Sequence, residues 1–270
     1  MAARRKVSEE SGADPKQPPT RDMFHDSAFE VLQPANGHRA GMDALLIAAA
    51  LAEDAEGIVA DLGAGAGTAG LAALNLNREL DLLAVEKNSE MIGFLEKTAN
   101  LKHNLRFSSR MKILEADVSL SGLERERAGL LVDSVDHVIM NPPYNFSDRR
   151  PPKDELKAEA YMMGAGGLDA WFRTAAAIVK PGGTLCMIYR TENLGEILAC
   201  TQSRFGGIEI LPIHSRANEA AKRLLVRGKR GSRAPFSLAP GFIIHETDGS
   251  FTPKAKAIFD GKARLEFATV

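Results

Sequence analysis

A glycine-rich loop directly after a short apolar segment limits this chain to few folds. Residues 57–62 (GIVADL) are typical of a buried strand, and the loop 63–67 leads into a helical pattern at 68–76. Glycines permit a tight backbone turn and a close approach to a ligand that a Cβ would block. The free N–H groups that begin the next helix can bind an anionic group. The order strand, loop and helix therefore predicts a ligand site at the end of this strand.

The rest of the chain repeats the alternation of apolar strands and amphipathic helices. We predict strands at residues 57–62, 81–86, 111–115, 135–140, 184–189, 208–213 and 223–226, and helices at 44–51 (with Asp43 as N-cap), 68–76, after Asn88, and at 168–179. Such an alternation gives a parallel sheet covered by helices. We therefore expect an α/β fold with a doubly wound, mostly parallel, seven-stranded, Rossmann-like sheet and helices on both faces.

The length and composition indicate one large domain. A chain of 270 residues with 44% hydrophobic and 26% charged residues can bury a full α/β core. Residues 1–22 are polar and rich in proline, so we expect a disordered tail. The remainder, residues 23–270, is expected to form a single domain, with a lead-in at 23–56 and an extension at 240–270 that contains a possible strand at 242–245 and a short helix.

Cysteine usage and hydropathy narrow the location of the protein. Cys186 and Cys200 have neither a CxxC nor a Cys/His ligand spacing, which argues against a disulfide framework or a zinc site and favours a reducing cytoplasm. The longest apolar run, residues 44–52, is too short to span a membrane. The first twenty residues lack the apolar core of a secretion signal. The net charge of −1 means that any nucleic-acid site must be a local basic patch.

Two carboxylates follow the next two predicted strands. Glu86 ends the second strand, where it can accept hydrogen bonds from both hydroxyls of a ribose. Asp117 ends the third strand, where it can accept a hydrogen bond from the amino group of a cofactor adenine. A solvent-exposed strand end for Glu86 and an ordinary loop aspartate for Asp117 are the alternatives. Signals at three successive strand ends favour a ligand that contains a nucleoside.

The fourth strand ends in Asn141-Pro142-Pro143-Tyr144. The first and fourth strands of a doubly wound sheet are neighbours, so this segment is expected to face the glycine loop. A conjugated amine is a poor nucleophile, but the side-chain carbonyl of Asn141 and the backbone carbonyl of Pro142 can each accept one of its N–H groups. The prolines fix the backbone, and Tyr144 can stack on a flat substrate. A proline-rich turn with Tyr144 as a packing residue is the alternative.

Together, DLGAGAG (61–67), AVEKN (84–88), EADV (115–118) and NPPY (141–144) resemble the motifs of class I amino N-methyltransferases. The third glycine comes one residue too early for the G-x-G-x-x-G pattern of dinucleotide-binding proteins. The resemblance implies S-adenosyl-L-methionine as the cofactor and no metal. The predicted cofactor-binding residues are Asp61, Gly63, Ala64, Gly65, Gly67, Glu86, Lys87, Asp117, Val118 and Asn141, and the predicted catalytic residues are Asn141, Pro142, Pro143 and Tyr144.

The flanking segments are similar to the bacterial tRNA1(Val) (adenine-N6)-methyltransferase family. They are residues 37–46 (GHRAGMDALL), 221–228 (AKRLLVRG) and 247–252 (TDGSFT), and the resemblance covers roughly residues 27–260. His38 stands where an aromatic residue is more usual. The family implies a cytoplasmic enzyme that methylates the exocyclic nitrogen of an adenine beside the anticodon of a tRNA.

A basic cluster towards the C-terminus is the candidate RNA contact. Residues 216–233 contain seven basic side chains and one acidic side chain. The predicted RNA contacts are Arg216, Lys222, Arg223, Arg227, Lys229 and Arg230, together with the loop Arg149–Lys153. A solvated strand edge and an ordinary surface loop are the alternatives.

Other functions remain open at this point. Release-factor glutamine methyltransferases use the same tetrapeptide, although they have a helical domain ahead of the core, whereas about forty residues precede the first core helix here. An amino methyltransferase acting on rRNA or DNA is another possibility, but we find no separate target-recognition domain. A non-catalytic cofactor-binding protein would not need the tetrapeptide opposite the glycine loop.

Overall fold

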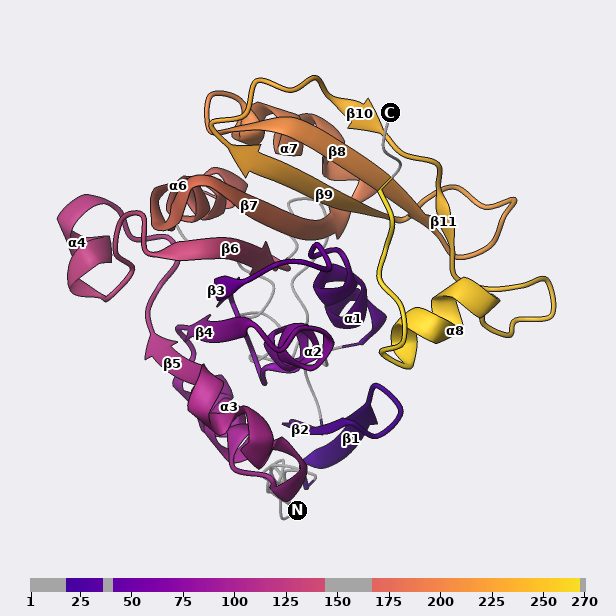
Figure 1. Cartoon of the computed structure of the whole chain (residues 1–270), viewed down its shortest axis with the longest axis horizontal. Coiled ribbons are helices and arrows are strands. Elements are labelled where there is room, and N and C mark those ends of the chain that lie inside the picture. The colour runs from indigo at the N-terminus through magenta and orange to yellow at the C-terminus, as the bar shows by residue number, and fades with distance from the viewer. Residues whose placement is uncertain (1–17, 36–40, 144–166, 268–270) are drawn as a thin grey trace, which may run out of the picture.

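The computed structural model describes residues 18–35, 41–143 and 167–267. In this part of the chain, seven strands of five or more residues follow the order β8-β9-β7-β6-β3-β4-β5 (Figure 1). These strands are β3 (Gly57–Leu62), β4 (Leu80–Glu86), β5 (Met111–Glu115), β6 (Val135–Met140), β7 (Val179–Arg190), β8 (Phe205–His214) and β9 (Arg223–Arg230). Only β9 among these seven runs antiparallel to its neighbours. The predicted doubly wound, mostly parallel sheet is confirmed.

Two short strands extend this sheet beyond the predicted seven. They are β10 (Ser237–Leu238) and β11 (Phe242–Ile243), and both pair in parallel with β8. The described sheet therefore has nine strands. The strand predicted at 242–245 corresponds to β11, whereas the two residues of β10 are too few for a recognisable alternation of apolar and polar residues.

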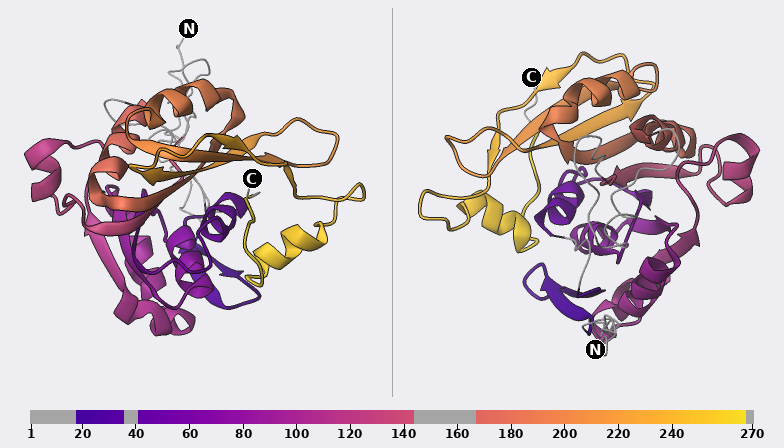
Figure 2. Two further views of the ribbon diagram at one scale, coloured as in Figure 1. Left: turned by 45° about the horizontal axis from the view of Figure 1, so that its top comes forward. Right: turned by 180° about the vertical axis from the view of Figure 1, so that it is seen from behind.

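Helices cover both faces of the sheet, as predicted (Figures 1 and 2). One face packs against α1 (Met42–Ala49), α2 (Thr68–Leu76), α3 (Ser89–Ala99) and α8 (Pro253–Phe259), and the other packs against α6 (Gly167–Ile178) and α7 (Leu194–Thr201). Strand β7 contributes to both cores, because Ile188 joins the first cluster and Tyr189 joins the second. The shorter α4 (Gly122–Arg127) and η2 (Thr191–Asn193) connect strands to the next elements.

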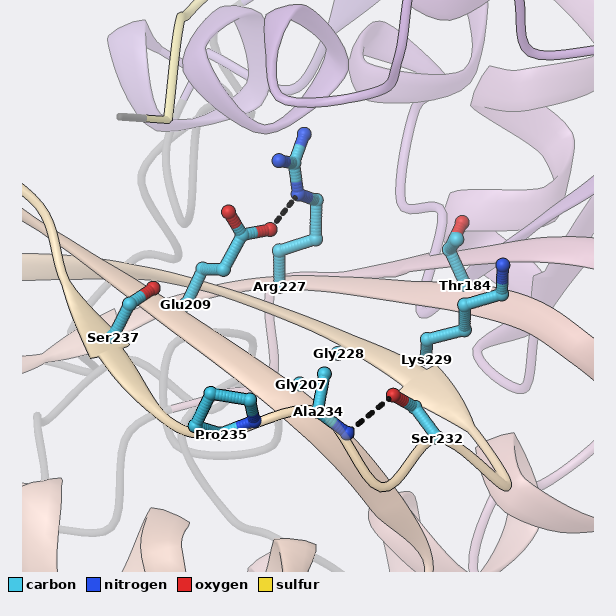
Figure 3. Close-up of a pocket in the computed structure, with 10 residues that line it drawn as sticks. All are labelled: Thr184, Gly207, Glu209, Arg227, Gly228, Lys229, Ser232, Ala234, Pro235 and Ser237. Atoms are coloured by element: carbon cyan, nitrogen blue, oxygen red, sulfur yellow. Dashed lines mark hydrogen bonds and ion pairs between the residues drawn. The ribbon is translucent and has the colours of Figure 1, made fainter. Parts of the chain in front are cut away.

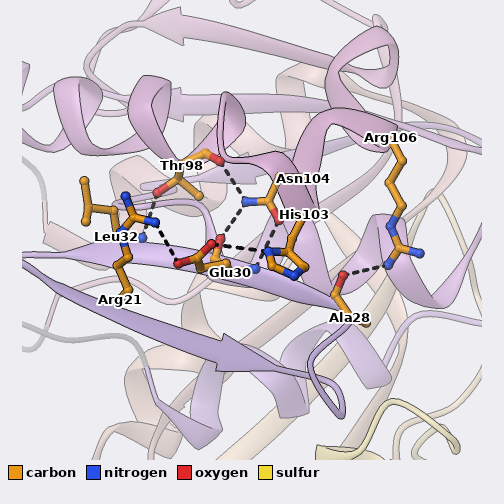
Figure 4. Close-up of polar contacts among 8 residues, drawn as sticks. All are labelled: Arg21, Ala28, Glu30, Leu32, Thr98, His103, Asn104 and Arg106. Carbon is orange, nitrogen blue, oxygen red and sulfur yellow. Dashed lines mark hydrogen bonds and ion pairs between the residues drawn. The ribbon is translucent and has the colours of Figure 1, made fainter.

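A separate hairpin of β1 (Thr20–Phe24) and β2 (Phe29–Gln33) packs on α3 and on η1 (Lys102–Arg110) (Figure 4). The fully buried Asn104 accepts from the Glu30 N–H at 3.1 Å and donates to the Glu30 carbonyl, while Thr98 Oγ1 accepts from the Leu32 N–H at 3.1 Å. The predicted tail boundary at residue 22 is therefore wrong, because β1 begins at Thr20. The polar residues of β1 are ordered by pairing across the hairpin, which a local pattern does not reveal. Residues 1–17 lie outside the described residues.

Two predicted helix starts have different outcomes. Asn88 is the N-cap of α3, as predicted, and its side chain accepts from the Met91 N–H at 3.0 Å. Asp43 is not an N-cap, because α1 begins at Met42 with Gly41 in the N-cap position. The Asp43 carboxylate instead accepts a hydrogen bond from Arg223 Nε at 3.0 Å, which joins α1 to β9.

Within residues 18–35, 41–143 and 167–267, no helix is both long enough and apolar enough to cross a membrane.

Candidate active site

The predicted motifs meet at one edge of the sheet. Strands β3, β4, β5 and β6 are parallel neighbours, so their carboxyl ends lie side by side. Leu62, the last residue of β3, pairs with Val85 on one side and with Met140 on the other. The glycine loop and Asn141 therefore begin at directly paired residues. This is the edge at which doubly wound folds bind their ligands.

The glycine loop has a backbone that other residues would strain. Gly63, Gly65 and Gly67 have φ values of 73°, 56° and 93°, in the left-handed region that favours glycine. The N–H groups of Gly63 and Ala64 both donate to the Val85 carbonyl at 2.9 Å. These contacts fix the loop against β4, next to the start of α2.

Asp61 lies beneath the loop and is only 4% exposed. Its Oδ2 accepts from the Gly70 N–H at 3.0 Å, which holds the first turn of α2 against β3. Burial raises the pKa of Asp61 to about 7, the Gly70 hydrogen bond opposes this shift, and the negative charge of Glu86 adds to it. The enclosed carboxyl therefore holds α2 against β3, and its predicted contact with the cofactor stays a prediction.

Glu86 is held by three backbone N–H groups. Its Oε2 accepts from Gly65 at 2.9 Å, and its Oε1 accepts from Lys87 and Asn88 at 2.9 Å each. A carboxylate has about four acceptor positions, so capacity for one further donor remains. The predicted contact with two ribose hydroxyls therefore requires the Gly65 N–H to be displaced or shared.

Asp117 stands beside Lys87 at the end of the next strand. Its Oδ1 accepts from the Ser119 N–H at 2.7 Å, and its Oδ2 lies 3.7 Å from Lys87 Nζ. Burial raises the pKa of Asp117, but the hydrogen bonds from Ser119 and the charge of Lys87 outweigh it, and the net pKa lies below its usual value. Asp117 is therefore a charged acceptor at this edge of the sheet.

Helix α6 contacts the glycine loop after β3 and the loop after β5 that contains Asp117. The sequence did not predict either contact. A Cβ on Gly63 would lie 2.7 Å from Trp171 Cη2, so the indole ring occupies the space beside the loop. Thr174 Oγ1 donates to the carbonyl of the buried Val118 at 2.7 Å. Trp171 follows Gly63 by more than a hundred residues and Thr174 follows Val118 by 56, so no local pattern signals these contacts.

The segment after β6 lies next to β7. Pro142 is buried, whereas Asn141 and Pro143 are partly exposed. The hydroxyl of Tyr189, on β7, donates to the Pro143 carbonyl at 3.2 Å. The remaining member of the predicted tetrapeptide, Tyr144, and the predicted RNA-contact loop Arg149–Lys153 lie outside the described residues.

The predicted basic cluster is dispersed and does not form one patch. Arg223 pairs with Asp43, Arg227 pairs with Glu209 and lies over Phe267, and Arg230 bonds to Asp133 and to the Val179 carbonyl. These three arginines therefore have structural partners. Lys229 pairs with Thr184 in the β7–β9 register, six residues before the carboxyl end of β7.

Arg216 and Lys222 remain close to the candidate site. They lie in the loop between β8 and β9, beside the carboxyl end of β7, where Arg190 pairs with Arg223. Their side chains are 49% and 69% exposed, and each lies within 4.0 Å of Glu219. Both are available to a large ligand that approaches this edge.

A pocket of about 380 Å³ lies on the sheet away from this edge (Figure 3). Its polar lining includes Thr184, Glu209, Arg227, Lys229 and Ser232. Thr184 lies six residues before Arg190, which ends β7 at the candidate site, and Gly207 lies near the start of β8, so the pocket does not form part of the candidate active site. Within the pocket, Arg227 and Glu209 neutralise each other at 2.7 Å.

The strand order, the single antiparallel strand β9 and the glycine loop beside Asn141 define a class I S-adenosylmethionine-dependent methyltransferase. Residues 40–211 match the family described as "Methyltransferase small domain", and the chain belongs to that family. This result agrees with the cofactor and enzyme class that the motifs predicted.

Individual relatives are similar over most of the chain. The crystal structure of a "predicted O-methyltransferase" from Agrobacterium tumefaciens is 39% identical and has a TM-score of 0.72, covering 83% of this chain and 98% of that chain. The tRNA1(Val) (adenine(37)-N6)-methyltransferase of Porphyromonas gingivalis is 26% identical over 86% of this chain and 91% of that protein. A 16S rRNA N2 G1207 methyltransferase from T. thermophilus shares the fold at 18% identity, with a TM-score of 0.52, over 78% of this chain and 50% of that chain.

Proposed function

We propose that this protein methylates the exocyclic amino nitrogen of an adenine in RNA, and that the RNA is a tRNA. The main support is the position of Asn141-Pro142-Pro143. This segment directly follows Met140, and Met140 pairs with Leu62, the residue directly before the glycine loop. Two hydrogen-bond acceptors, the Asn141 side-chain carbonyl and the Pro142 backbone carbonyl, are thereby offered beside the proposed cofactor site.

The two acceptors match an amino group better than a hydroxyl. An NH₂ group has two N–H donors, so each carbonyl can accept one of them, whereas a hydroxyl has one donor. Holding both N–H groups orients the nitrogen for attack and favours its tetrahedral form in the transition state. Bound S-adenosylmethionine supplies an electrophilic methyl group. The methylated nitrogen is cationic and loses its proton readily, so no general base is required before methyl transfer.

The residues at the other strand ends fit the cofactor by their chemistry. We propose that the glycine loop approaches its amino acid part, that Glu86 accepts from its ribose, and that Asp117 accepts from its adenine amino group. The hydrogen bonds that Glu86 Oε1 accepts from Lys87 and Asn88 hold that carboxylate before the cofactor binds, while its Oε2 shares the Gly65 N–H with the ribose. Such preorganisation reduces the entropy lost on binding.

The choice of tRNA rests on the relative from Porphyromonas gingivalis, which aligns over nearly its whole length. The exposed Arg216 and Lys222 near the site are compatible with contacts to RNA phosphates. The similar protein from Agrobacterium tumefaciens is described as a predicted O-methyltransferase, a class that methylates an oxygen. The acceptor therefore has to be identified chemically.

Isotope transfer from labelled S-adenosylmethionine distinguishes these acceptors. The protein is incubated separately with total tRNA, rRNA, duplex DNA and a purified release factor, and each product is digested and identified by mass spectrometry. We expect labelled N6-methyladenosine in the tRNA sample. Labelled methylglutamine, an O-methylated nucleoside, or N6-methyladenosine in rRNA or DNA alone would contradict the proposal.

A further inference from the structure

The end of β6 cannot be held in the sheet by its own N–H groups. Pro142 and Pro143 have no backbone N–H, so neither residue can donate a hydrogen bond to a neighbouring strand. The last backbone pair between β6 and β7 is Met140 with Met187. Tyr189 lies two residues further along β7, beside the segment that has left the ladder. Its hydroxyl donates to the Pro143 carbonyl at 3.2 Å and so extends the attachment of this segment to β7.

Packing alone does not explain the hydroxyl of Tyr189. The side chain is 0% exposed and belongs to the hydrophobic cluster that also contains Met140 and Trp171. A phenylalanine would bury almost the same apolar surface without a polar atom that needs a partner. The position of the hydroxyl at a carbonyl of the acceptor segment therefore suggests a role in the reaction.

The geometry of proline transmits this contact to the reacting group. The ring of Pro143 fixes its φ, so the preceding peptide plane can turn relative to the Pro143 carbonyl only about the Cα–C bond of Pro143. That preceding plane contains the Pro142 carbonyl, which is one of the two proposed acceptors. Holding the Pro143 carbonyl therefore also restricts the direction of the Pro142 carbonyl.

We propose that Tyr189 is a positioning residue for methyl transfer: its hydroxyl holds the Pro143 carbonyl and thereby directs the Pro142 carbonyl at the acceptor amine. This inference rests on the proposed function of the Asn141–Pro143 segment. It concerns the orientation of the acceptor and not the binding of the cofactor, because the glycine loop, Glu86 and Asp117 are held by other contacts.

The test compares Tyr189→Phe with a matched loss of a buried hydroxyl elsewhere. Thr201→Val is the control, because Thr201 is 4% exposed and its Oγ1 donates to the Leu198 carbonyl at 2.8 Å within α7. Cofactor affinity is measured from the fluorescence of Trp171, the single tryptophan, whose ring lies against the glycine loop. The transfer rate is measured in single turnovers at saturating cofactor, on the acceptor that the wild type methylates in the isotope experiment.

We expect Tyr189→Phe to lower kcat and the single-turnover rate by roughly ten-fold, because small misplacements of reacting groups slow catalysis strongly. The KM for the acceptor and the Kd for S-adenosylmethionine should stay within about two-fold, and Thr201→Val should react at the wild-type rate. An unchanged rate for Tyr189→Phe would overturn the inference, as would equal losses in the two variants or a weakened Kd that accounts for the loss. A wild type that methylates a different class of amine would refute the proposed substrate but would leave this comparison valid.

Discussion

The candidate active site lies at the edge formed by the carboxyl ends of the strands, here called the active edge, and the two halves of this edge are held together differently. On the cofactor half, formed by β3, β4 and β5, the loops are fixed mostly by backbone N–H groups that donate to nearby carbonyls and carboxylates. On the acceptor half, formed by β6, β7 and β9, the contacts join distant parts of the chain: Tyr189 reaches Pro143 across 46 residues, and Arg223 reaches Asp43 across 180 residues. Substitutions should therefore separate cofactor binding from methyl transfer.

The largest expected effect is on the acceptor half. Asn141→Ala removes one of the two acceptors for the amine and should lower the transfer rate by about 100-fold or more. Losses of this size are typical when one oriented polar group is removed from a site where charge develops in the transition state. The affinity for S-adenosylmethionine, measured by Trp171 fluorescence, should stay almost unchanged.

Asn100→Ala is the matched control for this substitution. Asn100 is an exposed asparagine whose Nδ2 donates to the Glu96 carbonyl at the end of α3. It should react at the wild-type rate. A near-normal rate in Asn141→Ala would remove the main support for the proposed reaction.

On the cofactor half, Asp61 should make stability depend on pH. The folded-state pKa of about 7 is raised above the unfolded value of about 3.9, so the folded protein binds this proton more tightly. The contribution of Asp61 to the free energy of unfolding therefore falls as pH rises from about 4 to about 7 and is constant above that range.

The variant Asp61→Asn keeps an acceptor for the Gly70 N–H but cannot ionise. Between pH 5 and pH 8 the wild type should lose about 2 kcal/mol more stability than this variant. Urea denaturation at the two pH values measures the difference, and Asp81→Asn, at an exposed position on β4, controls for the loss of one carboxylate. Parallel pH dependence in wild type and Asp61→Asn would show that the buried carboxyl is not the cause.

The contact between the glycine loop and α6 should have a smaller effect. Gly63→Ala places a Cβ 2.7 Å from Trp171 Cη2 at a φ of 73°, and we expect a loss of about 1–2 kcal/mol in stability. Affinity for S-adenosylmethionine should fall as well, because the loop must shift. Gly93→Ala is the control, since a Cβ there has nothing within 4 Å and lies in α3. Equal melting temperatures for both variants would contradict a tight fit between the loop and α6.

The cofactor half could be predicted from the sequence because its determinants are local. The strand limits at 57–62 and 111–115 agree with β3 and β5, and Asn88 is the N-cap that its position predicted. Periodicity, glycines and caps act over a few residues, so one sequence is enough to identify them. The roles predicted for the individual site residues remain proposals.

The acceptor half could not be predicted in the same way. Nothing near Tyr189 in the sequence indicates that it contacts Pro143. On the cofactor half, the contact of Trp171 with Gly63 was missed for the same reason. Asp43 precedes a helix, which suggested an N-cap, but its actual partner is Arg223 on β9. The basic cluster is continuous in sequence, yet β9 runs along the sheet and so leads Lys229 and Arg230 away from the active edge. Partners of this kind are set by the tertiary fold.

The smallest expected effect tests the part of the basic cluster that stays at this edge. Arg216→Ala should raise the KM for tRNA by about two- to five-fold and reduce the slope of log affinity against log salt by about one, because one phosphate contact is lost. Lys256→Ala is the control, since Lys256 is similarly exposed but lies on α8 and pairs with Asp260. Filter binding at several salt concentrations measures both. If the two variants have the same salt slope as the wild type, the RNA does not approach over the β8–β9 loop, and the acceptor half must receive it from another side.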